Sequence, residues 1–447
     1  MTGRRFAIAL AAIALLGLAL RAIYGLHVGA GHGIGDDDWY HRVANGLADG
    51  RGFSDPFASL VGGRRVSGLA GQPIPTAFHL PAFPWLLAPV SKLGLRSYTA
   101  HQAVGWVLGA GTVALAGMAT RSLWDARAGL AAAGIAAIYP PLIANDSVMM
   151  SESLYGFLIA AVVLLALTLR KRPGWPRAAA LGAALAAAAL TRQEALLLVL
   201  LLLPWIARRA RPRDAAVVAA VVLVLCAPWA IRNSTLYDRP VPLTTGDGSV
   251  FGAANVPSTY HGSGLGSADF NALFASPVGR TAVANEAVQS ERWRKEGLTY
   301  AGHHAGRLPV VIGARVLRTW GFYPFDPRQR ATQVAFLEAR SRTFELIAYP
   351  AQLVVLALAA MGALALRRRG EPLWPLLALC VLITVVSATG YGAPRLAQAG
   401  DVALVVLAGI GALAVSRSRA REALRARLPS RSRPRGSTGS PAPSGPR

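Results

Sequence analysis

Residues 150–169 read MSESLYGFLIAAVVLLALTL, and Arg170, Lys171 and Arg172 follow at once. A run of about 18 apolar residues is long enough for a helix to cross a lipid bilayer, and a basic cluster at its end is typical of the cytoplasmic side. Comparable runs recur outward from this one along the 447 residues of the chain, of which 53% are hydrophobic. A soluble domain does not need such repeated uncharged runs. The sequence therefore predicts an all-α polytopic membrane protein.

About ten transmembrane helices are expected, and the first apolar run is interpreted as an uncleaved span. The short connections alternate between basic and nearly uncharged, so the positive-inside rule places both the N-terminus and the C-terminus in the cytoplasm. The high Ala, Arg and Gly content favours a bacterial source, which makes the plasma (inner) membrane the expected location. The predicted spans are 6–26, 101–120, 128–146, 150–169, 177–190, 194–207, 214–231, 346–366, 372–390 and 398–416.

Two larger extracytoplasmic loops follow from this topology. The N-terminal transmembrane catalytic module covers 1–231 and includes the first extracytoplasmic loop, 27–100. The second extracytoplasmic loop region is 232–345, and the C-terminal transmembrane helices occupy 346–416. The last segment, 417–447, consists mainly of Arg, Ser, Pro and Gly, which predicts a disordered basic tail in the cytoplasm.

The formal net charge of +24 would suit a nucleic-acid-binding protein. However, many of the Arg and Lys residues stand at the ends of apolar runs, where they orient spans and contact lipid phosphates. The expected partner is thus the lipid bilayer, and no nucleic acid is expected. The sequence also contains no P-loop and no dinucleotide fingerprint, which argues against nucleotide-driven chemistry.

An acidic triplet directly follows the first span. Asp36, Asp37 and Asp38 precede Trp39 and Tyr40, and the segment from Tyr40 to Gly52 has an apolar spacing that suits a short amphipathic helix on the membrane surface. A carboxylate there can act as a general base or hold a cation. The alternative is a solvated acidic loop or a helix N-terminal cap, a position that Asp favours.

Further polar residues gather at the predicted outer ends of spans. For the acidic residues among them, a purely solvated position at a helix end is an equally good interpretation. Three arginines lie on the face that the positive-inside rule depletes, where they are either interfacial anchors or ligands of a phosphate. These residues are Asp146 and Glu152, Arg192 and Glu194 in a short hairpin, Arg232 and Asn233 after the seventh span, and Arg395 in the last outer turn.

Several ordered motifs carry a resemblance to a known family. They are Asp36 to Tyr40 with Leu47 to Phe53, Tyr139-Pro140-Pro141, Thr191-Arg192-Gln193-Glu194, and Ala227-Pro228-Trp229 followed by Arg232-Asn233. In order and spacing they resemble the membrane glycosyltransferases of the GT-C fold. The similar group is that of the protein mannosyltransferases and the lipid A aminoarabinose transferase.

The resemblance implies a hexosyl- or pentosyltransferase that uses a polyprenyl-phosphate-linked sugar as donor. A carboxylate in the first outer loop would act as base, and polyprenyl phosphate would leave with inversion. The acceptor would be a glycan, lipid or protein of the cell envelope, and no cofactor is certain, although a divalent metal remains an open alternative. The implied catalytic residues are Asp36 or Asp37, the donor-phosphate ligands are Arg192, Arg232 and Arg395, and the lining residues are Asp38, Tyr40, Asp146, Glu152, Glu194 and Asn233.

Two other functional classes compete with an enzyme. A transporter or flippase of a lipid-linked sugar would need polar or broken helices near the bilayer midplane. The polar residues here gather instead at the outer ends of spans, which favours an interfacial active site. A non-catalytic scaffold that kept the fold is the second rival, and the acidic triplet together with three outer arginines argues against it.

Overall fold

The protein is a multi-pass helical membrane protein. The computed structural model describes residues 2–28, 35–61, 64–67, 71–280, 285–338 and 340–427. Among these, six helices are long and apolar enough to cross a membrane. They are α1 (Gly3–Val28), α4 (Tyr98–Leu123), α7 (Glu152–Lys171), α10 (Pro212–Tyr237), α18 (Arg342–Arg368) and α20 (Gln398–Arg427), the last counted together with the preceding turn η3 (Pro394–Ala397).

The predicted count of about ten spans is not confirmed. A seventh span exists if α5 (Ala126–Ile138) and α6 (Pro140–Ser147) are taken as one bent helix. The helices α8 (Trp175–Ala189), α9 (Ala195–Arg209) and α19 (Trp374–Thr389) are 15, 15 and 16 residues long. A straight crossing needs about 20 residues, so these three are too short by that measure.

The bend between α5 and α6 lies where the sequence predicts a break. The two helices meet at 57°. Pro140 has no backbone N–H to continue the hydrogen bonding of α5, but it is well suited to the first turn of a new helix. Proline thus accounts for the break at Tyr139-Pro140-Pro141, which divides the predicted span 128–146 into two helices.

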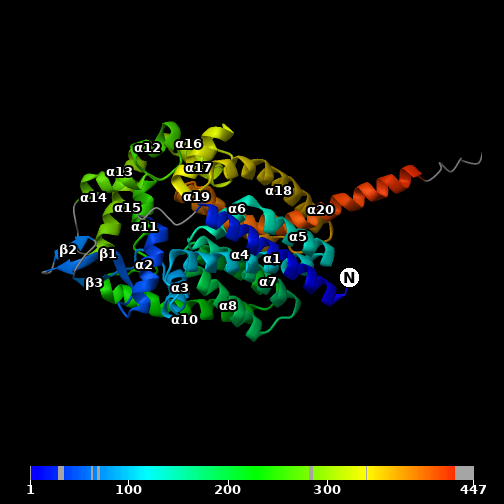
Figure 1. The fold of residues 1–447 in the computed structure, drawn as a ribbon, viewed down its shortest axis with the longest axis horizontal. Helices are drawn as coiled ribbons and strands as arrows, with labels where there is room; N and C mark the ends of the chain where they lie inside the picture. The colour runs from blue at the N-terminus through cyan, green and yellow to red at the C-terminus, as the bar shows by residue number, and fades with distance from the viewer. Residues whose placement is uncertain are drawn as a thin grey trace, which may run out of the picture.

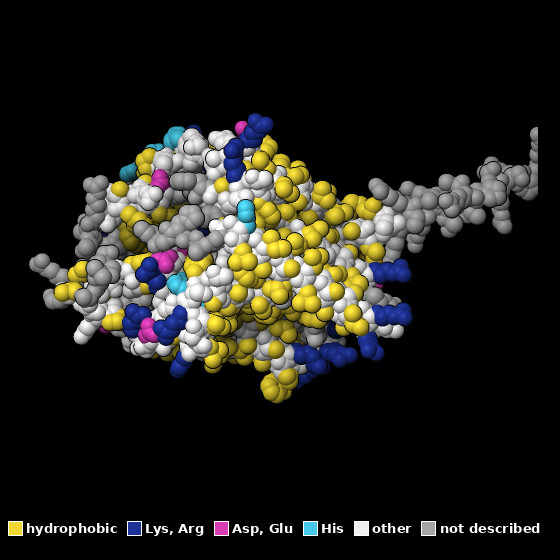
Figure 2. Space-filling model, in the orientation of Figure 1, with side chains coloured by type: hydrophobic (Ala, Val, Ile, Leu, Met, Phe, Trp, Pro, Cys, Tyr) yellow, Lys and Arg dark blue, Asp and Glu magenta, His cyan; other side chains and the backbone are white. Residues whose placement is uncertain are grey.

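The helices form an elongated bundle with a cap at one end (Figure 1). The N-terminus and the C-terminal end of α20 lie at the opposite end. Hydrophobic side chains cover the visible side of the bundle, and many Lys and Arg side chains gather at the end away from the cap (Figure 2). The cap contains α2 (Asp36–Ala48), α3 (Ala82–Lys92), α11 (Asp247–Ala253), α12 (Pro257–Tyr260), η1 (Gly262–Gly264), α13 (Phe270–Ala275), α14 (Pro277–Arg280), α15 (Glu286–His303), η2 (Ala305–Arg307), α16 (Leu308–Thr319) and α17 (Pro327–Glu338).

A small antiparallel sheet in the cap departs from the all-α expectation. It has the order β2-β1-β3, with β1 (Ser54–Val61) between β2 (Arg64–Ser67) and β3 (Gln72–Pro75). Ala58 pairs with Ser67 on one side and Leu60 with Gln72 on the other. Glu286 of α15 ties the sheet to the second loop region, because its carboxylate accepts a hydrogen bond from the Thr76 hydroxyl at 2.9 Å.

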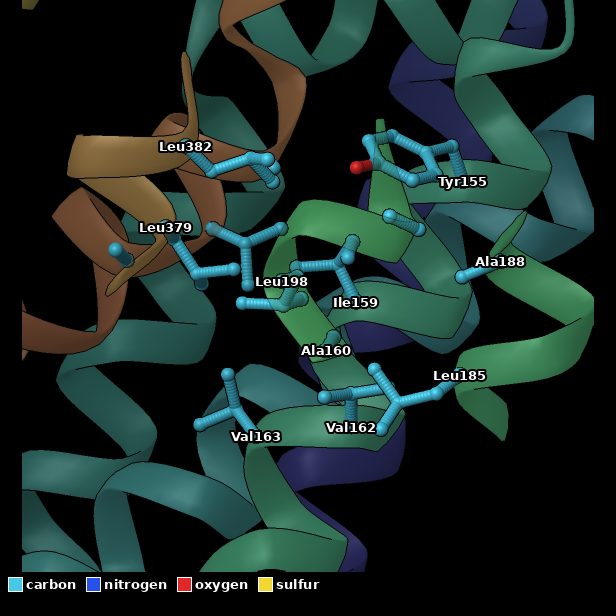
Figure 3. Packing of buried hydrophobic residues seen from close by; sticks show 14 of the residues in the cluster. Tyr155, Ile159, Ala160, Val162, Val163, Leu185, Ala188, Leu198, Leu379 and Leu382 are labelled. Atoms are coloured by element: carbon cyan, nitrogen blue, oxygen red, sulfur yellow. The ribbon is translucent and has the colours of Figure 1, made fainter. Parts of the chain in front are cut away.

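Helix α7 packs between several other helices in the apolar core. Small residues such as Ala160 let the neighbouring helices approach closely. Figure 3 shows Tyr155, Ile159, Val162 and Val163 of α7 near Leu185 and Ala188 of α8, Leu198 of α9, and Leu379 and Leu382 of α19.

A buried ion pair joins α1 to α6 inside the bundle. Arg21 Nε lies 2.9 Å from Asp146 Oδ2, and both side chains are fully buried. Gln398 Nε2 donates to the other carboxylate oxygen of Asp146 at 3.2 Å. A Cβ at Gly109 of α4 would overlap both partners, so the pair requires glycine there.

Two helices extend well past their predicted ends. Helix α10 continues to Tyr237, past the predicted span end at 231, and α20 continues to Arg427, past 416. Residues 428–447 of the predicted tail lie outside the described residues. The surface helix expected after the acidic triplet is α2, which starts at Asp36 and so takes the triplet into its first turn.

Candidate functional site

The first turn of α2 sends the three aspartates to different partners. Negative side chains suit this position because the N-terminus of a helix carries a partial positive charge. Asp37 Oδ2 accepts a hydrogen bond from the Tyr98 hydroxyl at 2.8 Å. Asp38 is nearly buried and accepts one from Arg42 Nε at 2.7 Å. Successive helical residues point about 100° apart, which leaves Asp36 on a third side.

Asp36 faces basic side chains from two distant segments. Its Oδ2 lies 3.5 Å from Arg395 Nη1, and its Oδ1 lies 3.6 Å from His79 Nε2. The Asp36 side chain is 40% exposed, so a substrate can reach it. Burial raises the pKa of Asp36, but the positive charges of protonated His79 and of Arg395 lower it more, to below its usual 3.8. The carboxylate is therefore ionised at neutral pH and can accept a proton.

The turn between α8 and α9 brings Arg192 to the start of α7. Arg192 Nη1 donates to Glu152 Oε1 at 2.8 Å, and Arg192 Nε donates to Glu194. Glu152 is almost fully buried, whereas 18% of the Arg192 side chain stays exposed. The aromatic ring of Tyr155 lies beneath the guanidinium, 5.8 Å away.

Arg395 completes the group from the turn η3. Its Nε lies 3.9 Å from the same Glu152 oxygen that binds Arg192, and its Nη2 donates to the Tyr391 hydroxyl at 3.1 Å. Glu152 thus stands between two guanidinium groups, one of which also faces Asp36. We call Asp36, Glu152, Arg192, Glu194 and Arg395 the acidic–basic site.

Aromatic rings pack together next to Asp36. Tyr40 is 5% exposed and its ring lies 5.2 Å from His79 and 5.2 Å from Phe83. Trp39 also packs against His79, with 4.5 Å between the ring centroids. Burial raises the pKa of Tyr40, so this hydroxyl stays protonated. These contacts fix α2 and His79 relative to each other.

Three residues of the predicted site have other partners. Arg232 donates to the backbone carbonyls of Thr76 and Phe53 at 2.7 and 3.2 Å, and its guanidinium lies over the Trp229 ring. These contacts indicate that Arg232 anchors the first loop. A phosphate-binding role for Arg232 stays a prediction that its geometry does not support.

The other two are buried within hydrogen-bonding networks. Asn233 donates to the Leu243 carbonyl at 3.1 Å and accepts from Arg232. Asp146 is held by Arg21 and Gln398 inside the bundle, as described above. Neither residue contacts Asp36 or Arg395, so their place in the lining of the site remains a prediction.

Two neighbours of the site are absent from the sequence-based set. His79 carries no metal-ligand spacing, and a lone histidine in a loop gives no signal of a contact to Asp36. Tyr391 stands four residues before Arg395, yet only the three-dimensional turn reveals that its hydroxyl meets the guanidinium.

The part of the chain that the structure describes contains no cluster of metal-ligating side chains. There, no three His, Cys, Asp or Glu side chains come close enough together to hold an ion. The carboxylates of Glu152 and Glu194 are instead paired with Arg192. The steps proposed below use only side chains of this chain and are not routed through a metal ion.

The geometry permits two kinds of chemistry side by side. An ionised, accessible carboxylate can remove a proton from a hydroxyl. The guanidinium of Arg395 can bind phosphate oxygens, because its side chain is 24% exposed and its contact to Asp36 is long.

Comparison with solved structures identifies the fold. The apo oligosaccharyltransferase of Archaeoglobus fulgidus matches with a TM-score of 0.55 and 13% identity, covering 97% of this chain and 53% of that one. The same organism's AglB in complex with an inhibitory peptide and a dolichol-phosphate matches with a TM-score of 0.53 and 13% identity, covering 96% and 52%. The chain spans about half the length of these structures.

A weaker likeness links the chain to ArnT from Cupriavidus metallidurans bound to undecaprenyl phosphate. Its TM-score is 0.41 at 14% identity, covering 96% of this chain and 82% of that one, which is too low to support an argument. The sequence matches no protein-family model and no curated protein. The arrangement of its helices nevertheless shows that the chain has the GT-C fold of the membrane glycosyltransferases.

Proposed function

We propose that this protein is a glycosyltransferase that moves a sugar from a polyprenyl-phosphate-linked donor to a cell-envelope acceptor. The observation that carries the proposal is the pairing of an accessible carboxylate, Asp36, with the guanidinium of Arg395 beside Arg192. The AglB structure with the same fold holds a dolichol-phosphate, which supports a lipid-linked donor. The transferred sugar is a hexose or a pentose.

The reaction is an inverting displacement. Asp36 takes the proton of the acceptor hydroxyl while the oxygen of that hydroxyl attacks the anomeric carbon of the donor. The bond between that carbon and the phosphate oxygen breaks, and polyprenyl phosphate leaves with the electron pair. Arg395 and Arg192 stabilise the negative charge that grows on the leaving phosphate, a role that preorganised donors perform well.

Asp36 is the proposed base in preference to Asp37. The carboxylate of Asp37 is engaged by the Tyr98 hydroxyl, and Asp38 is engaged by Arg42. Of the three, only Asp36 contacts Arg395, the arginine that would hold the leaving group. Glu152 then serves to space the two guanidinium groups.

The site is proposed to open on the extracytoplasmic side of a bacterial inner membrane. It lies where α2 of the cap meets η3 and the start of α7, whereas the N-terminus and the end of α20 lie at the other end of the bundle (Figure 1). Lys and Arg side chains gather at that other end, as expected for the cytoplasmic side (Figure 2). The segment 1–231 then forms the catalytic module, and 232–345 shapes the choice of glycan, lipid or protein acceptor.

The transporter alternative draws on one observation. An ion pair within a membrane bundle often marks a transport path, and Arg21 with Asp146 is such a pair. However, both side chains are fully buried and bonded to each other. A closed pair of this kind supports the helix packing rather than a route for a substrate.

The test is donor turnover by the purified protein in nanodiscs. A panel of polyprenyl-phosphate sugars is supplied, and mass spectrometry follows loss of each donor with wild type, Asp36→Asn and Asp37→Asn. We expect one donor to be consumed by wild type and by Asp37→Asn, and not by Asp36→Asn. A donor that is bound but never cleaved would move the assignment to a flippase or a scaffold.

A further inference from the structure

We propose that Glu338 is a positioning residue that sets the place of Arg395 in the acidic–basic site. This inference rests on the proposed function, in which Arg395 holds the leaving phosphate. Glu338 is the last residue of α17, and it touches the backbone of Arg395 rather than the reacting atoms.

The contact is direct and buried. Glu338 Oε1 accepts a hydrogen bond from the backbone N–H of Arg395 at 3.3 Å. Its other oxygen forms an ion pair with Arg340 Nη2 at 2.8 Å. The Glu338 and Arg340 side chains are 5% and 2% exposed, so water does not compete for either contact.

A second set of contacts holds the backbone carbonyl of Arg395 in the same turn. Asn145 of α6 approaches the Arg395 carbonyl with Nδ2 at 3.5 Å and donates to Gln398 Oε1 at 2.5 Å. Arg340 also donates to the Asn145 side chain. Arg340 therefore links Glu338 to Asn145, and both the N–H and the carbonyl of Arg395 are held.

The turn η3 needs this support because it is short. It contains four residues, and Pro394 contributes no N–H to it. The guanidinium of Arg395 must reach Asp36 at 3.5 Å and Glu152 at 3.9 Å from opposite sides. A shift of about 1 Å in a group that orients a substrate can cost about 10²-fold in rate. Loosening the backbone of Arg395 would produce a shift of this kind.

Glu345 provides a matched control. It binds the same arginine as Glu338 does, with Glu345 Oε1 3.3 Å from Arg340 Nη1, but it does not contact Arg395. Replacing Glu345 thus removes a neighbouring negative charge from Arg340 without removing a bond to η3.

The activity test compares Glu338→Met, Glu338→Gln and Glu345→Gln in nanodiscs with the donor that wild type consumes. Glu338→Met keeps the bulk of the side chain but cannot accept the N–H bond, and we expect turnover to fall by about 10²-fold. Glu338→Gln retains an acceptor oxygen and should keep most of the wild-type turnover. Glu345→Gln should have a turnover near that of wild type. Equal loss in the Met and Gln variants would overturn the proposal.

A double variant tests whether the effect passes through Arg395. Because Glu338 acts on Arg395, Glu338→Met should cause no further loss of turnover in an Arg395→Ala background. Losses that multiply would show that Glu338 acts by another route and would overturn the inference.

Hydrogen exchange gives a readout that needs no activity. In the protein without donor, mass spectrometry of the peptide around residues 391–398 should show faster exchange in Glu338→Met and unchanged exchange in Glu345→Gln. Unchanged exchange in Glu338→Met would overturn the positioning role. If wild type consumes no donor while this exchange difference is present, the proposed function fails but the structural hold on Arg395 stands.

Discussion

Asp36 and Arg395 lie 359 residues apart in the chain, and their side chains meet with 3.5 Å between Arg395 Nη1 and Asp36 Oδ2. One belongs to the first turn of α2 and the other to η3, directly before the last helix. The site therefore closes only when the first and the last parts of the bundle have assembled. A protein truncated before η3 would keep the carboxylate and lose the guanidinium that faces it.

Replacing Asp36 by Asn should reduce transfer by about 10²–10⁴-fold, because the base that accepts the hydroxyl proton is removed. Asp37→Asn should cause a much smaller loss, since that carboxylate is engaged with Tyr98. The measurement is the initial rate of product formation in nanodiscs, with thermal unfolding as the control for folding. Full activity in Asp36→Asn would refute the assignment of the base.

Arg395 and Arg232 should respond differently to the same change. Arg395→Gln removes a donor from the leaving phosphate, and we expect turnover to fall by about 10²–10³-fold with little change in stability. Arg232→Gln instead leaves backbone carbonyls of the first loop without their donors, at about 1–3 kcal/mol each. Its turnover per folded molecule should stay near wild type. Rates and unfolding midpoints measured on both variants separate the two roles, and the opposite pattern would contradict them.

The pH dependence should reveal the contact between His79 and Asp36. The pKa of Asp36 lies below its usual 3.8, so the rate should be level at neutral pH and fall in acid as the pH approaches and passes that lowered pKa. His79→Phe keeps the ring packing on Trp39 and Tyr40 but removes the positive charge that forms on the imidazole at acidic pH. The pKa of Asp36 then rises, and the acid limb of the rate profile moves to higher pH. A profile from pH 3 to 7, with stability checked at each pH, measures the shift; an unmoved limb would count against the contact.

The buried pair Arg21–Asp146 should matter for stability rather than for chemistry. Arg21→Met leaves an uncompensated carboxylate inside the bundle and should cost about 3–5 kcal/mol of unfolding free energy. The double variant Arg21→Met, Asp146→Leu should recover much of that loss, because no charge remains unpaired. Denaturant unfolding in detergent measures both, and a double variant less stable than Arg21→Met would contradict this account.

Local sequence signals located much of the site. Asp36, Glu152, the hairpin with Arg192 and Glu194, and Arg395 all stand out in the sequence as polar residues at the ends of apolar runs, and the structure brings them close together, whereas Asp37 and Asp38 have other partners. The break at Tyr139-Pro140 was equally local, because proline removes a backbone donor wherever it stands. The GT-C resemblance of the motifs agrees with the observed fold.

Other features depend on contacts that local signals do not carry. In the sequence, Arg232 and Arg395 are both arginines at the outer end of a predicted span. In the structure they differ in their partners, because Arg232 binds backbone carbonyls of the first loop and Arg395 faces Asp36. His79 and Glu338 act through residues far away in the chain. The three-stranded sheet is formed by short strands that lack long alternating patterns, and the short helices α8, α9 and α19 blur the count of spans.

The acidic triplet at the start of α2 has a consequence for how the gene can vary. Its three identical side chains occupy successive positions about 100° apart, ahead of the anchored rings of Trp39 and Tyr40. One residue inserted between Asp38 and Trp39 would move Asp37 into the position that Asp36 now holds relative to those rings. A carboxylate would still face Arg395. The repeated aspartate thus protects the site against a one-codon insertion that would disable an enzyme built on a single acidic residue.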